Sequence, residues 1–276
     1  MQKRPESTTN HRIQQPRRRS GWRRHAGKWF YRAKRYGAWW LCGTRFAASR
    51  CAALPEPVFA HQSPLLRRLR AVDMQLQYNK ITNLRLAAEA IDGLLIRPGE
   101  VFSFWKRVGR PTARRGFLEG MVLQDGRVQR GMGGGLCQMG NLLHWMVLHT
   151  PLTVTERWRH SYDVFPDEHR TLPFGSGATL AYNYIDLQFR NDTRQNWQIR
   201  VWLSDTHLHG ALHCEQPLPC RYEVFEQAHW MQHEHWGGYS RHNVLARRIH
   251  QDGATLREEV LLENHALMMY SPFLNP

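Results

Sequence analysis

The chain has 276 residues, of which 42% are hydrophobic and 22% charged, and its formal net charge is +15. This length and apolar content are enough for one sizeable core. The positive charge is concentrated near the N-terminal end: residues 1–50 hold 14 lysines and arginines and one acid, whereas the remaining residues hold 24 basic and 22 acidic side chains. A nearly balanced globular part argues against a nucleic-acid-binding fold as the explanation of the charge.

The apolar runs and the cysteines of the sequence bear on membrane insertion, localisation and disulfide formation. No run of about 18 apolar residues exists, which excludes a membrane-spanning helix. The apolar stretch of residues 37–42 is too short for a signal sequence, so we predict a cytoplasmic chain, with peripheral membrane association as the alternative. Five scattered cysteines favour reduced thiols over a disulfide framework, although Cys214 and Cys220 are close enough in sequence to form one bridge.

The basic N-terminal segment lacks a regular apolar pattern over residues 1–36, which predicts a mobile arm. We expect residues 1–57 to form a basic, largely disordered arm and linker, and residues 58–276 to form a single domain. The arm is a candidate for weak contact with a membrane or with nucleic acid. A solvated tail with no specific role explains the same composition equally well.

Apolar periodicity predicts the elements that follow. Helical spacing indicates amphipathic helices over residues 65–76 and 84–94, and a central helix after residue 135. Helices ahead of many antiparallel strands predict an α+β fold, with N-terminal helices and one central cysteine-bearing helix packed on a mainly antiparallel sheet. The strand signals cover residues 101–105, 117–123, 152–158, 178–182, 185–189, 197–203, 208–214, 222–225, 244–250 and 254–262.

The glycines Gly133, Gly134 and Gly135 stand just before Cys137, at the start of the central helix. Consecutive glycines leave a bare backbone that can approach a ligand closely. Unpaired amides and the helix dipole at a helix start favour a thiolate. This is the environment of a cysteine nucleophile. The alternative is a small apolar residue packed at a helix start.

A cysteine nucleophile needs a base and a group that orients the base. His160 is the best candidate base, because it ends a strand signal among polar neighbours. Asp163 or Asp186 would orient its ring, although Asp186 also fits an outward-facing strand residue. Arg157 offers a bidentate clamp for a substrate carboxylate, with solvated charge as the alternative.

The chain carries six separate motifs in one order between Asn79 and Leu187, with the stretch from Gly133 to Gln138 among them. Together they resemble the VanW family, first associated with glycopeptide resistance of the vancomycin B type. The resemblance covers about residues 63–270 and implies a single VanW-like domain. It also implies a link to peptidoglycan cross-linking, because some multi-domain relatives are cysteine L,D-transpeptidases whose cysteine matches Cys137. The chain departs from the usual pattern at Gly140, where relatives often have serine. The motifs lie at residues 79–84, 98–105, 133–138, 156–161, 173–179 and 186–187.

These observations predict acyl transfer or hydrolysis on cell-wall peptides through a Cys137 thioester. The amides of Cys137 and of the glycine loop would hold the oxyanion. We predict no metal and no cofactor, and the oligomeric state is left open. The alternative is a non-catalytic peptide- or glycan-binding module linked to glycopeptide resistance, with a structural Cys137. The predicted substrate-binding residues are Gly133, Gly134, Gly135, Gln138, Arg157, Trp105 and Ser161.

Overall fold

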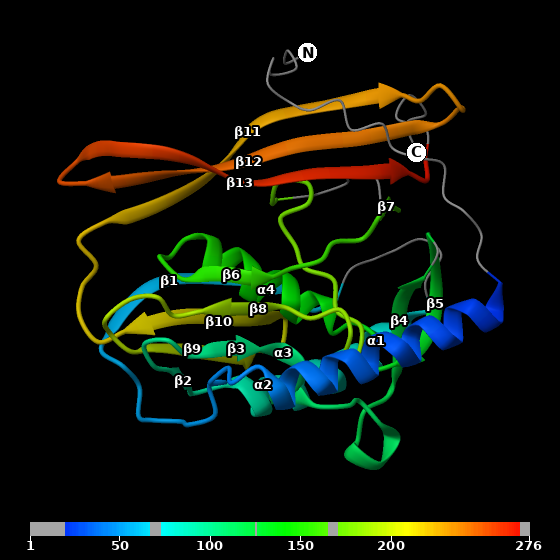
Figure 1. Ribbon diagram of the computed structural model, residues 1–276, viewed down its shortest axis with the longest axis horizontal. Coiled ribbons are helices and arrows are strands. Elements are labelled where there is room, and N and C mark those ends of the chain that lie inside the picture. The colour runs from blue at the N-terminus through cyan, green and yellow to red at the C-terminus, as the bar shows by residue number, and fades with distance from the viewer. Residues whose placement is uncertain (1–19, 67–72, 125, 165–170, 271–276) are drawn as a thin grey trace.

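The computed structural model describes residues 20–66, 73–124, 126–164 and 171–270 (Figure 1). Helices and mainly antiparallel sheets make it an α+β fold, as the sequence predicts. The helices are α1 (Gly21–Leu41), α2 (Met74–Ile91), α3 (Phe104–Val108) and α4 (Cys137–Leu148), together with the 3-10 turn η1 (Ala113–Arg115).

The strands form four sheets, with orders β1-β10-β9-β2, β11-β12-β13-β7, β3-β8-β6 and β4-β5. Among the named strands, the pairs are antiparallel except for β13 with β7. The strands are β1 (Glu56–Pro64), β2 (Leu94–Ile96), β3 (Val101–Ser103), β4 (Glu119–Gln124), β5 (Arg127–Met132), β6 (Thr153–Glu156), β7 (Tyr162–Asp163), β8 (Gln188–Arg190), β9 (Trp197–Leu203), β10 (His207–Cys214), β11 (Arg221–His233), β12 (Tyr239–Gln251) and β13 (Ala254–Met268).

The sheets lie in two bodies of the molecule (Figure 1). The long strands β11, β12 and β13 form an upper layer, and the segment around β7 reaches up to it. The other sheets and the helices form the lower body. There α4 contacts β1 and β10, and α2 contacts β9 and β4. The cysteine-bearing helix therefore packs on the sheet that contains β1 and β10.

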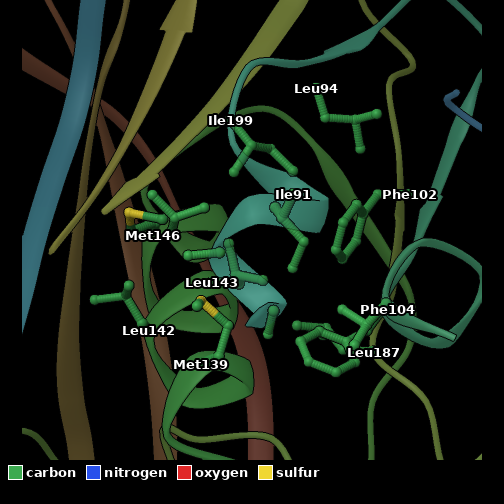
Figure 2. Packing of buried hydrophobic residues seen from close by; sticks show 14 of the residues in the cluster. Ile91, Leu94, Phe102, Phe104, Met139, Leu142, Leu143, Met146, Leu187 and Ile199 are labelled. Carbon is green, nitrogen blue, oxygen red and sulfur yellow. The ribbon is translucent and has the colours of Figure 1, made fainter. Parts of the chain in front are cut away.

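The core is built around α4 and α2. Figure 2 shows Met139 and Leu143 of α4 on the side that faces Ile91 of α2, with Phe104 and Leu187 close by. All five side chains are fully buried. Burial of each apolar side chain of this size contributes about 1.5–3 kcal/mol. The first turn of α4, which carries Cys137, is thus anchored by the most buried part of the fold.

Most of the predicted strands are confirmed. The hairpin after residue 123 is present, because Gln124 pairs with Arg127 across the turn between β4 and β5. The predicted strands over residues 197–203 and 208–214 are β9 and β10, and the C-terminal hairpin is longer than predicted. The strand predicted over residues 101–105 ends at Ser103, where α3 begins. Strand β1 was not predicted.

The largely disordered arm and linker expected over residues 1–57 contain an ordered helix and a buried segment. Residues 21–41 form helix α1, and Ala47, further along, is buried in the core. The physical reason is that α1 is held by contacts to segments more than 100 residues away, which no local pattern reveals. Residues 1–19 lie outside the described part of the chain. The helix predicted over residues 65–76 is wrong at its start, because Leu65 and Leu66 follow strand β1 and are not helical. Residues 67–72 lie outside the described part of the chain, and helix α2 begins at Met74.

Helix α1 lies along the lower body (Figure 1) and is attached at several points. The Arg35 guanidinium donates to both carboxylate oxygens of Glu156, at 2.5 Å each. Arg32 donates to the Tyr182 carbonyl at 2.8 Å. Within the described ranges, no helix is both long enough and apolar enough to cross a membrane.

Candidate functional site

The glycine loop joins β5 to α4, and its amides are all used within the protein. The N–H groups of Gly133, Gly134 and Gly135 each donate to a backbone carbonyl at 3.0 Å. Those carbonyls belong to Leu118, Gly131 and Met121 respectively. The loop is therefore fastened to β4 and β5. The expectation that a glycine-loop amide holds an oxyanion is wrong for this structure, because none of the three donors is available.

The glycines are required by close packing. A Cβ atom on Gly134 would lie 2.1 Å from the carbonyl carbon of Gly120, a distance that real contacts do not show. Gly135 has a φ of +90°, and a Cβ there would lie 2.1 Å from Cγ of Lys80. Backbone and a neighbouring side chain occupy the space that the sequence suggested for a ligand. The loop is a packing feature that sets where α4 begins.

The side chain of Asn83, in α2, hydrogen-bonds to the glycine loop and to the residue before β4. Its side-chain nitrogen donates to the carbonyls of Gly134 at 2.9 Å and of Leu118 at 3.0 Å. Its side-chain oxygen accepts the Leu118 N–H at 2.8 Å. Site prediction from the sequence missed this residue. The available signal was the motif at residues 79–84, which contains Asn83 just before the helix predicted over residues 84–94.

Cys137 is the first residue of α4, and Leu180 faces its sulfur. The sulfur accepts the Leu180 N–H at 3.5 Å and donates to the Leu180 carbonyl at 3.8 Å. Although the residue is partly exposed, burial of the thiol raises its pKa. Hydrogen bonds from the amides of Leu180 and Cys137 act in the opposite direction and are outweighed. Burial therefore favours the neutral thiol, which opposes the effect expected from the helix start.

His160 is not joined to the thiol in the described part of the chain. The Cys137 sulfur hydrogen-bonds to the backbone amide and the backbone carbonyl of Leu180. Burial, with a smaller effect of the neighbouring Arg159 cation, lowers the pKa of His160. Its ring is therefore neutral at pH 7, the protonation state that a general base needs. The His160 imidazole thus has the protonation state of a base, but it does not hydrogen-bond to the Cys137 sulfur in the described part of the chain.

The two candidate orienting acids lie in separate clusters. The Asp163 carboxylate accepts from the Tyr270 hydroxyl at 2.8 Å and from Arg241 at 3.4 Å. These partners tie β7 to the upper sheet. Asp186 is fully buried, so the outward-facing interpretation is wrong. Its oxygens accept from Ser103 at 2.6 Å, from Gln188, and from the amides of Trp105 and Leu187. Four donors leave no place for orienting His160.

Asp186 and Glu156 form a carboxylate cluster that the sequence analysis did not assign. Burial raises the pKa of Asp186 to about 6, and the nearby Glu156 carboxylate adds to the shift. The Glu156 oxygens accept from Arg35, from the Trp158 indole and from the Asp186 amide. This cluster links α1 to β6 and β8. Its carboxylate oxygens accept hydrogen bonds from the protein, and the bond from Arg35 attaches the helix.

The predicted substrate-binding side chains are mostly engaged in structural contacts. The partly buried Arg157 guanidinium, predicted as a carboxylate clamp, donates to the carbonyls of Gly177 and Gly175 and to the Asn264 side chain. Trp105 is buried and donates to the Ile185 carbonyl. Two predicted residues reach the surface: Ser161 is exposed, and Gln138, next to Cys137, donates to Ser63 and to the Pro64 carbonyl.

Comparison with known proteins decides the family. Residues 79–213 match the family described as "VanW like protein". The chain is 38% identical, over 171 residues, to the vancomycin B-type resistance protein VanW of Enterococcus faecalis, covering 62% of each chain. Residues 79–213 of the chain belong to the VanW family. It is also 32% identical over 119 residues to the uncharacterized protein YoaR of Bacillus subtilis, covering 43% of this chain and 38% of the relative. The chain spans less than two thirds of the length of either relative, and no solved structure matches it.

The VanW match contains the glycine loop, Cys137 and all of α4. It also contains His160, Asp163 and Asp186. Helix α1 and strands β11, β12 and β13 lie outside the matched residues. The candidate site thus lies within the VanW-like region, whereas α1 lies outside it.

The raised pKa of the VanW cysteine leads to a labelling prediction. We expect iodoacetamide to label Cys42 faster than Cys137 near neutral pH, and the Cys137 rate to keep rising at higher pH. Hydrogen bonds from Thr44 lower the pKa of the exposed Cys42, whereas burial raises that of Cys137. Peptide mass spectrometry at several pH values measures both rates in one sample. Equal labelling of the two residues at pH 7 would contradict a neutral resting thiol.

Proposed function

We propose that this VanW family chain acts on cell-wall peptides by acyl transfer or hydrolysis through Cys137. One observation carries the proposal: the sulfur lies in the first turn of the buried helix α4 and meets the Leu180 amide donor at 3.5 Å. That donor and the positive end of the helix stabilise a thiolate once a base removes the proton. The Enterococcus faecalis relative is named for vancomycin resistance, which supports a cell-wall substrate.

The proposed reaction has two steps. In the first, the Cys137 sulfur bonds to the carbonyl carbon of a peptide, the carbon–nitrogen bond breaks, and the leaving amine takes the proton that came from the thiol. In the second, an amine or water attacks the thioester carbonyl and the carbon–sulfur bond breaks. The proton of the attacking group returns to the sulfur, and the free thiol is restored.

We assign the base to His160, with Asp163 as the proposed orienting acid. Burial keeps the His160 ring neutral at pH 7, so it can accept the thiol proton. Catalytic hydrogen bonds often form only in the complex with substrate, so bound peptide is expected to bring the ring to the sulfur. Gln138 and Ser161 are the proposed polar contacts for the peptide, because they lie beside the two reacting groups in sequence and are not buried.

Matched cysteine variants test the proposal. With purified peptidoglycan stem peptides as substrate, Cys137→Ala should lower the rate of product formation by roughly a thousandfold or more, because the nucleophile is lost. Cys220→Ser is the control, since Cys220 is also a partly exposed free thiol but lies at the edge of the upper sheet. Chromatography of the peptide products gives both rates. Equal rates for the parent and Cys137→Ala would refute the nucleophile.

A second candidate function is a non-catalytic module that binds a peptide or glycan in glycopeptide resistance. The saturated glycine amides and the buried neutral thiol favour this alternative. In that case Cys137→Ser should bind peptidoglycan fragments as tightly as the parent protein. Calorimetric titration of the same fragments separates the two functions, because a module shows unchanged affinity and no products.

A further inference from the structure

The side of α1 that points away from the domain is apolar. Trp22, Trp29 and Trp40 are 77%, 76% and 88% exposed, and Phe30 and Leu41 are also exposed. Steps of seven and eleven residues return to the same side of an α-helix, so the three tryptophans form one stripe. We call these five residues the outer face. Large apolar side chains gathered on one exposed side are the mark of a binding surface.

The opposite side of α1 is fixed to the domain. Arg35 pairs with the Glu156 carboxylate, and Arg32 donates to the Tyr182 carbonyl. At the border of the outer face, one step of seven residues after Trp29, the hydroxyl groups of Tyr36 and Tyr182 lie 2.5 Å apart. These contacts hold the helix in one rotation about its axis. The outer face is therefore presented outward and cannot turn into the core without breaking them.

The charge of α1 identifies what the outer face meets. The helix has six lysines and arginines and no acid, and Arg23 and Lys34 lie exposed beside the apolar stripe. Aromatic side chains on one face with cations along the edges are typical of helices that lie in the surface of an anionic bilayer. The positive charge alone would also favour binding to nucleic acid. A phosphate backbone, however, provides no apolar surface against which the five exposed apolar side chains could be buried.

We propose that α1 binds anionic lipid bilayers through its outer face, lying flat in the headgroup region. A helix of 21 residues is about 32 Å long. No helix of the described chain meets the length and apolarity needed to cross a membrane, which fits binding parallel to the surface. Tryptophan rings take the boundary between headgroups and acyl chains, and Arg23 and Lys34 meet the lipid phosphates.

Membrane binding through α1 also orients the VanW region. Tyr182, which contacts Arg32 and Tyr36, follows by two residues the Leu180 backbone that holds the Cys137 thiol. The bilayer would therefore lie on the α1 side of the domain, close to the first turn of α4. The proposal stands on α1 alone and is independent of any chemistry at Cys137.

Vesicle sedimentation tests the proposal with the full chain. The parent protein should sediment with vesicles of phosphatidylcholine and phosphatidylglycerol, and much less with phosphatidylcholine alone. The double variant Trp29→Ser, Trp40→Ser should bind the anionic vesicles at least about tenfold more weakly. It lacks two indole rings that the proposal inserts into the bilayer. Trp202→Ser is the matched control, since Trp202 is 47% exposed on β9, away from α1.

Each other outcome overturns the proposal. Undiminished vesicle binding by the double variant would place the contact elsewhere. Binding to a DNA duplex, with no sedimentation on vesicles, would assign α1 to nucleic acid. A dimer that the double variant turns into a monomer, again without vesicle binding, would assign the outer face to a second copy. Circular dichroism of the variants confirms that helix content is kept, so that loss of binding is not loss of fold.

Discussion

Gly134→Ala is expected to destabilise the domain by about 3 kcal/mol or more, the largest effect of any small substitution in the glycine loop. The added methyl would lie 2.1 Å from the Gly120 carbonyl carbon and 2.3 Å from its oxygen. Both are backbone atoms of β4, so no flexible side chain can move aside. The loop must shift, which would also displace the first turn of α4 and Cys137.

Urea unfolding at one pH measures this effect as a lower midpoint. Gly27→Ala is the control, because nothing lies within 4 Å of the added methyl and the site is within helix α1. Alanine is the better helix former by about 1 kcal/mol, so this variant should be as stable as the parent or more stable. A Gly134→Ala protein with an unchanged midpoint would show that the two backbones are not packed against each other.

Asn83→Ala is the second large effect that we expect, at about 3 kcal/mol of lost stability. The substitution removes three hydrogen bonds, to the carbonyls of Gly134 and Leu118 and from the Leu118 amide. Each buried group left without a partner costs about 1–3 kcal/mol. The loss also releases the glycine loop from α2, so a variant that still folds should have an altered Cys137 environment.

Asn79→Ala provides the control for Asn83. Asn79 lies one turn earlier in α2 and donates to a single carbonyl, that of Glu119, at 2.8 Å. It is also less buried, so its loss should cost about 1 kcal/mol. Thermal and urea unfolding of both variants give the comparison. Similar costs for the two asparagines would contradict a special role of Asn83 under the loop.

The sequence was most informative where structure is set locally. The turn between Gln124 and Arg127 and the apolar spacing of Met139, Leu143 and Met146 predicted a hairpin and a helix that the structure confirms. The same local information placed Cys137 in the first turn of that helix. Near neighbours in the chain decide such features, so a pattern of a few residues is enough.

The sequence was least informative where a side chain meets a distant partner. The Arg157 guanidinium, predicted to bind a substrate carboxylate, donates hydrogen bonds to residues 18 and 107 positions away in the sequence. Asp186 found four donors inside the fold in place of a histidine. The pKa of Cys137 depended on burial, which no helix-start argument includes. Helix α1 was missed because its apolar side faces outward and its attachment is to Glu156.

The central claim is that Cys137 forms a covalent thioester with a cell-wall peptide. Its most direct test is the intact mass of the protein after incubation with a peptidoglycan stem peptide and a rapid acid quench. The account predicts a mass increase equal to the acyl part of the peptide, located on the fragment that contains Cys137 and absent from Cys137→Ala. An unmodified mass during measurable product formation, or an adduct on Cys220 in its place, would contradict the claim.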